Sequence, residues 1–281
     1  MASQFASLLF LAICPTPAWS ADILSCKDVN GKTIFTDNTA NCVGQTQKHE
    51  IHDSLTSGLA NYSSPPRTYY RIPGDWNIMV EQDMAAADPK LTAAASSRLQ
   101  QMLTAILEKL PAASHQHVKG RNFYLMWGPR SPKGGKKGYG HYMEAILSVD
   151  PLRLPMYDPA WKNAVVIYST DFFMSWDDVY IRHSLAHEIA HTWHQREVLR
   201  KNRQIIDALE AAKRAGLYKN VASLKRGNIG RAYALTNDHE YFAELSAAYF
   251  IGGTYFPYSR EDLKKYDPIG YRMVEDLWDL R

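Results

Sequence analysis

The sequence predicts an α+β fold, because short strand-like segments come before most of the segments with helical spacing. A first helix with apolar residues at about every 3.6 positions is ended by Pro111. Three short apolar runs rich in β-branched and aromatic residues then predict the strands of a small mixed sheet. A long helix and several shorter ones follow. We expect helices at 91–111, 177–200, 205–218, 237–250, 260–267 and 269–280, and strands at 122–127, 142–149 and 164–169.

Composition narrows the class of protein. The chain has 281 residues, of which 46% are hydrophobic, so one sizeable domain with a small appendage is expected. The net charge of +3 is small for this length and argues against a general nucleic-acid binder. Beyond the N-terminal segment, no stretch is apolar enough to cross a membrane. The sequence leaves the oligomeric state open.

Residues 1–20 have the pattern of a secretory signal peptide. The run from Phe5 to Cys14 is almost entirely apolar, and Pro15 and Pro17 follow it. Small residues then precede a cleavage point near Ser20, although no Lys or Arg stands before the apolar run. The mature chain is therefore expected in the periplasm or outside the cell, with no stable membrane insertion after cleavage.

A small β-hairpin unit and a linker are expected over 21–64. Asn30-Gly31 between two short segments is a strong turn signal, and Cys26 and Cys42 are the two cysteines left after cleavage. An even pair in an exported chain predicts a disulfide. The Cys-Asp-Gly-aromatic-Thr-Asp-Cys pattern resembles a small domain of unknown function that follows the signal peptide in many exported proteobacterial proteins. A linker rich in Ser and Pro then leads to the main domain, 65–281.

The segment Leu185–His194, "LAHEIAHTWH", holds the pattern His-Glu-x-x-His. His187 and His191 are four residues apart, so a helix places both imidazoles on one face, where they can bind one Zn²⁺ ion. Glu188 lies about 100° round the helix and can accept a proton from a zinc-bound water. The same pattern also arises by chance in a histidine-rich helix, and His183 and His194 are nearby. The third ligand therefore decides between the two interpretations.

Two positions for a third ligand follow from known zinc sites. A third histidine six residues after the second would fall at Glu197, with His194 where a chain-turning glycine is needed, so this class is excluded. A glutamate from a later helix is the other class, and "NDHEYFAELSAAYF" supplies Glu240 and Glu244 four residues apart. Glu240 can bind the metal, while Glu244 can accept the free N–H of a ligand histidine.

Residues Tyr233 to Glu244, "YALTNDHEYFAE", resemble the catalytic segment of the anthrax lethal factor family of zinc peptidases. That family pairs His-Glu-x-x-His with Tyr-x-x-Thr-Asn-x-x-Glu-Phe-Phe-Ala-Glu. The resemblance implies a zincin-like metallopeptidase domain in which His187, His191 and Glu240 bind zinc, Glu244 supports the ligands and Tyr233 stabilises the transition state. Tyr241 replaces the first Phe of the pattern, which is a mild departure. The resemblance covers the two catalytic helices, so it carries no expectation about toxin activity.

The expected function is that of an exported endopeptidase with one zinc ion, acting on a polypeptide in extended conformation that pairs with an edge strand at 140–149. Glu188 is the expected general base. Tyr139 and His141 precede that strand and could contact substrate, whereas His183, His194 and His239 are expected to be helix residues outside the ligand set. Two alternatives stay open. One is a non-catalytic protein stabilised by zinc, which would have no use for Glu188, and the other is a zinc amidase acting on cell-wall crosslinks.

Overall fold

The structure is a computed structural model of the chain, which separates into two compact units, 1–63 and 64–281. The first unit is described only by the backbone of its strands. The described residues are 23–27, 33–36, 43–49, 67–133, 146–148, 158–161, 163–198 and 201–281.

The first unit contains a three-stranded antiparallel sheet, with the order β2-β1-β3. It consists of β1 (Ile23–Lys27), β2 (Thr33–Thr36) and β3 (Val43–His49). Lys27 pairs with Thr33, so the two predicted segments run antiparallel to each other. The predicted Asn30-Gly31 turn and the Cys26–Cys42 disulfide lie outside the residues and side chains that the structure describes.

The second unit is built on a mixed sheet, as predicted for the main domain, but the sheet has five strands, and the sequence predicted only the three at 122–127, 142–149 and 164–169. Its order is β4-β5-β6-β8-β7. The three central strands are parallel, and both edge strands run antiparallel to their neighbours. The described part of the predicted strand at 142–149 is β7, which lies at one edge. The strands are β4 (Tyr69–Arg71), β5 (Asn77–Glu81), β6 (Asn122–Leu125), β7 (Ile146–Ser148) and β8 (Val165–Ile167).

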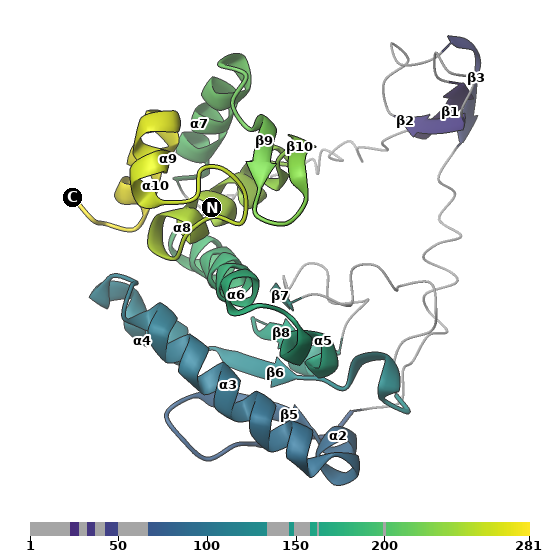
Figure 1. Ribbon diagram of the computed structural model, residues 1–281, viewed down its shortest axis with the longest axis vertical. Coiled ribbons are helices and arrows are strands. Elements are labelled where there is room, and N and C mark those ends of the chain that lie inside the picture. The colour runs from purple at the N-terminus through teal and green to yellow at the C-terminus, as the bar shows by residue number, and fades with distance from the viewer. Residues whose placement is uncertain are drawn as a thin grey trace, which may run out of the picture. The chain divides into compact units, whose positions relative to one another are not determined.

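Helix α3 (Pro89–Leu107) makes the crossover between the parallel strands β5 and β6, as such a pair requires (Figure 1). Asp88 caps it by accepting a hydrogen bond from the Leu91 N–H at 3.0 Å. The helix ends before the predicted Pro111, because residues 108–110 tighten into a turn. Pro111 instead precedes the next helix. The short neighbours of α3 are α2 (Gln82–Ala87), α4 (Ala112–Lys119) and α5 (Thr170–Ser175).

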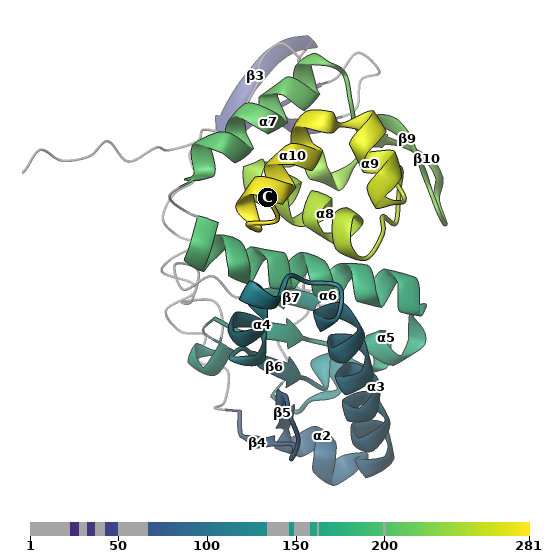
Figure 2. The same cartoon turned by 90° about the vertical axis from the view of Figure 1, so that its left-hand side faces the viewer.

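Helix α6 (Asp178–Trp193) lies in the middle of the second unit, between the sheet with α3 and α4 on one side and the C-terminal helices on the other (Figure 2). Its buried residues are distributed all round its axis, as expected for a helix covered on every side. We predicted one helix over 177–200. The α-helix instead ends at Trp193 and continues as a π-helical turn, His194–Val198. Within that turn, the buried His194 ring lies 3.0 Å from the Asn202 side-chain oxygen.

The C-terminal half contains α7 (Asn202–Arg214), α8 (Asp238–Phe250), α9 (Arg260–Tyr266) and α10 (Pro268–Leu277), in agreement with the predicted helices. It also contains an antiparallel hairpin, β9 (Lys219–Ser223) and β10 (Gly227–Arg231), that the sequence did not predict. Most residues of these two strands are exposed, so they lack the apolar alternation that would reveal them.

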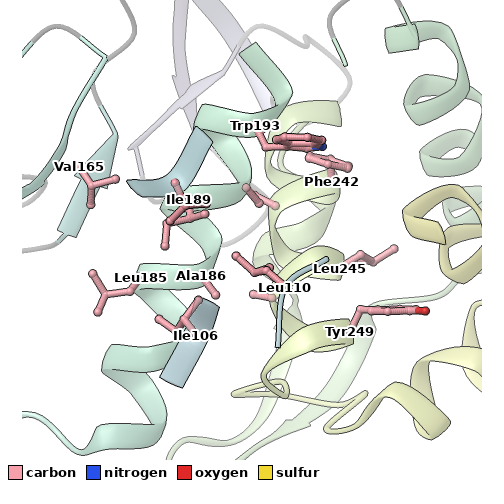
Figure 3. Packing of buried hydrophobic residues seen from close by; sticks show 14 of the residues in the cluster. Ile106, Leu110, Val165, Leu185, Ala186, Ile189, Trp193, Phe242, Leu245 and Tyr249 are labelled. Carbon is pink, nitrogen blue, oxygen red and sulfur yellow. The ribbon is translucent and has the colours of Figure 1, made fainter. Parts of the chain in front are cut away.

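The core between α6 and α8 is closed by aromatic rings. Figure 3 shows Leu185 and Ile189 on the side of α6 that faces Val165, and Trp193 beside Phe242 of α8. The Trp278 ring stacks on Trp193 at a centroid distance of 5.0 Å. This packing fixes the position of α8 against α6. Within the described part of the chain, none of the helices has the length and apolar character needed to cross a membrane.

Candidate metal centre

The two histidines of the His-Glu-x-x-His pattern lie on one face of α6. Their Nε2 atoms are 3.0 Å apart. His187 is buried and His191 is partly buried, so both rings are oriented by the surrounding protein. The i to i+4 spacing on a helix is sufficient to explain this pair.

The third side chain comes from the first turn of α8. The Glu240 Oε2 atom lies 3.0 Å from the Nε2 of His187 and 3.1 Å from that of His191. Asn237 caps the helix, and its side-chain oxygen accepts the N–H of Glu240 at 2.9 Å. The cap therefore fixes the backbone of the residue whose carboxylate reaches the histidines. A carboxylate in this turn is also favoured by the helix dipole.

The His187, His191 and Glu240 atoms are close enough together to hold one metal ion. Ligands at 2.0–2.1 Å from a tetrahedral Zn²⁺ stand about 3.3 Å from one another, a little more than the separations found here. Nδ1 of His187 faces Glu244, so the N–H of neutral His187 belongs on Nδ1 and its Nε2 presents a lone pair. The three atoms that converge here suit a cation: the Nε2 lone pair of His187, Nε2 of His191 and the carboxylate oxygen of Glu240. Two histidines with one glutamate form a known zinc donor set.

Glu244 supports this group from behind. Its Oε1 atom lies 2.7 Å from Nδ1 of His187, off the line of the ring N–H, and 3.4 Å from Nε2 of His183. The other nitrogen of His183 lies 2.8 Å from the Gly252 carbonyl oxygen. His183 thus positions Glu244, a role that the sequence analysis did not assign to it. Its position one helical turn before His187 was the available signal.

The charges in the group stabilise one another. Burial alone would lower the pKa of His187, but the carboxylates of Glu240 and Glu244 beside the ring outweigh burial and raise it well above its usual value. Burial would raise the pKa of Glu244, but the neighbouring His183 and His187 hold it well below its usual range. The pKa of Glu240 is lowered in the same way by His187 and His191, against the effect of burial. Both carboxylates are therefore ionised at neutral pH.

Two further predicted residues flank the group. The Tyr233 ring centroid is 5.9 Å from that of His187, and the residue is 52% exposed, so a substrate can reach it. Burial of the hydroxyl, with the negative charges of Glu240 and Glu188, raises the Tyr233 pKa, so the hydroxyl stays protonated and able to donate. Glu188 is partly buried, and its charge also raises the pKa of His187. All six predicted site residues are thus close together.

A polar chain that the sequence did not reveal joins the ends of three helices. His194 contacts Asn202 at the start of α7, and the Asn202 side-chain N–H donates to Asp238 of α8 at 2.8 Å. The group of His187, His191 and Glu240 does not include His194, whose ring contacts Asn202 instead. The ring of His239 packs against that of His194 at a centroid distance of 4.5 Å. Tyr139 and His141 lie outside the described residues.

Comparisons with protein-family models, with curated proteins and with solved structures found no match. The resemblance to the lethal factor family therefore rests on the motif residues alone.

Proposed function

We propose that the protein is an exported, zinc-dependent endopeptidase. The observation that carries the proposal is the convergence of His187, His191 and Glu240, from two helices, beside a glutamate that directly follows the first histidine. A purely structural zinc site has four protein ligands and no use for a neighbouring base such as Glu188. Export is proposed from the signal-peptide pattern of residues 1–20.

The side chains around the ligands have distinct proposed roles. Zinc bound to the three residues would lower the pKa of a water molecule and polarise the scissile carbonyl. Glu188 accepts the proton of that water and transfers it to the departing amine. Tyr233 donates its phenolic hydrogen to the oxygen on which negative charge develops. Glu244 holds the His187 ring in the orientation that directs Nε2 to the ligand cluster.

The proposed substrate is a polypeptide in extended conformation. β7 is an edge strand of the sheet and packs against α6, the helix that carries both histidines. An extended peptide can pair with such an edge through its backbone, while its side chains face alternate sides. This arrangement would bring a peptide bond next to the helix that carries Glu188.

The first experiment is the zinc content and peptidase activity of the purified mature protein and its variants. We expect about one zinc per chain in the wild type. Glu240→Ala should lose most of the zinc, whereas Glu188→Ala should keep it and lose cleavage. Glu210→Ala is the matched control, because Glu210 is an exposed glutamate paired with Lys213 on α7.

Other outcomes separate the alternatives. Zinc retained by Glu240→Ala would refute the ligand set. A wild type that binds zinc and cleaves no peptide would favour a zinc-stabilised binding protein, and cleavage of cell-wall crosslinks alone would favour an amidase.

A further inference from the structure

Tyr255 lies outside the predicted site, in the loop that follows α8. The backbone of this loop is fixed against β9: Tyr255 forms a β-bridge with Ser223, and the Phe256 N–H donates to the Ala222 carbonyl at 2.8 Å. Gly253 allows the loop to fold tightly, since a Cβ there would collide with the Pro257 carbonyl oxygen. The Tyr255 side chain is therefore held in place from its backbone outward.

The Tyr255 hydroxyl touches two parts of the proposed centre. It accepts the backbone N–H of Ala234 at 3.2 Å, and Ala234 directly follows Tyr233 in the short 3-10 turn Tyr233–Leu235. Tyr255 and Glu244 also line the same small cavity, so the hydroxyl is a neighbour of the Glu244 carboxylate. Burial and the negative charge of Glu244 raise the pKa of Tyr255 well above its usual value, so the hydroxyl stays protonated and able to donate.

The surroundings give these groups few other partners. The cavity that His183, Tyr218, Glu244 and Tyr255 help to line has a volume of about 10 Å³, enough for one water at most. A buried polar atom that loses its partner there cannot be rescued by bulk water. Removal of the Tyr255 hydroxyl would therefore take the acceptor from the Ala234 N–H and leave Glu244 without this neighbouring donor.

We propose that Tyr255 is a positioning residue that couples the metal ligands to Tyr233. Through Glu244 it orients His187, and through the Ala234 N–H it fixes the turn that presents the Tyr233 hydroxyl. This inference rests on the proposed function. It goes beyond that function because it assigns to the buried Tyr255 hydroxyl the alignment of both His187 and Tyr233, which lie in different segments of the chain.

The test is Tyr255→Phe, compared with Tyr258→Phe from the same loop. The Tyr258 hydroxyl donates to the Ala222 carbonyl at 3.0 Å near the surface and does not line the cavity beside Glu244, so the control loses a hydrogen bond from the same loop without changing that cavity. We expect Tyr255→Phe to weaken zinc binding, measured by chelator competition, by up to about ten-fold, since a direct partner of a metal ligand is worth about ten-fold or more and Tyr255 acts one contact further out, through Glu244. It should also lower kcat with little change in KM and alter the visible spectrum of the cobalt-substituted protein. Tyr258→Phe should match the wild type in all three.

A double-mutant cycle tests the coupling to Tyr233. In a Tyr233→Phe background, Tyr255→Phe should lower kcat much less than it does alone, while its effect on zinc affinity persists. Equal losses of kcat in both backgrounds would overturn the coupling. Glu244→Gln offers a second variant, which should weaken zinc binding at least as much as Tyr255→Phe. Wild-type zinc affinity in Glu244→Gln would overturn the route from Tyr255 to His187.

The results distinguish this inference from the proposed function. A wild type without zinc, or with zinc that survives Glu240→Ala, overturns the proposed function and the inference with it. If zinc binds through Glu240 and cleavage occurs, but Tyr255→Phe matches the wild type in zinc affinity and kcat, only the role of Tyr255 is overturned.

Discussion

Replacement of Asn237 by Ala tests whether the cap of α8 positions the proposed ligand Glu240. Asn237 accepts the Glu240 N–H at 2.9 Å, so the variant leaves that donor without its partner. Loss of such a cap costs about 1 kcal/mol, which for a domain of this size lowers the melting temperature by roughly 2–4 °C. If zinc binding must re-form the first turn at the same cost, zinc affinity falls about five-fold.

The matched control is Ser259→Ala. Ser259 caps α9 in a reciprocal arrangement with Asp262, and α9 contributes no residue to the metal group. We expect the two variants to lose similar stability in thermal unfolding of the metal-free protein. Only Asn237→Ala should bind zinc more weakly in a chelator-competition assay. Wild-type zinc affinity in Asn237→Ala, or equal weakening in Ser259→Ala, would refute the reasoning.

Four further predictions follow from the helix α6 and its surroundings. Zinc affinity should fall about ten-fold for each unit of pH below the raised pKa of His187, because zinc must displace one proton from the His187 ring. Calorimetric titration in buffers with different ionisation enthalpies measures the release of that proton. In the metal-free protein, the lowered pKa of Glu244 contributes stability above about pH 4.3, and this stability is lost as the pH falls. The raised pKa of His187 contributes stability below about pH 6.5, and this stability is lost as the pH rises through the pKa of the folded state. Urea unfolding at several pH values, with a chelator present, tests both directions. Arg98→Ala should destabilise the second unit by about 2 kcal/mol. The Arg98 guanidinium donates hydrogen bonds to the Trp176 carbonyl and to Asp178 at the start of α6, both at 2.7 Å. An unchanged midpoint of urea unfolding would contradict this prediction. Leu185→Ala should cost about 3 kcal/mol, because Leu185 is completely buried, and zinc stoichiometry should stay that of the wild type.

Local patterns were sufficient to predict several features of the candidate site. The spacing of His187 and His191 predicts a shared helix face, since that relation depends only on the helical repeat. Asn237, the first residue of the predicted helix 237–250, is the residue that caps α8 in the structure. The α+β class and a small mixed sheet were likewise predicted, because strand and helix periodicities differ along the chain. Each of these features depends on residues that are near one another in the sequence.

Only the tertiary structure revealed the residues that position the site from a distance. His183 contacts Glu244 across 61 positions, and Tyr255 reaches Ala234 across 21. The β9–β10 hairpin that fixes the Tyr255 loop has no apolar alternation, so its sequence resembles an exposed loop. These contacts exist because Trp193, Phe242 and Trp278 pack α6 against α8. A periodic pattern shows which face of a helix is buried, but not which distant side chain will meet it there, because side-chain packing between helices makes that choice.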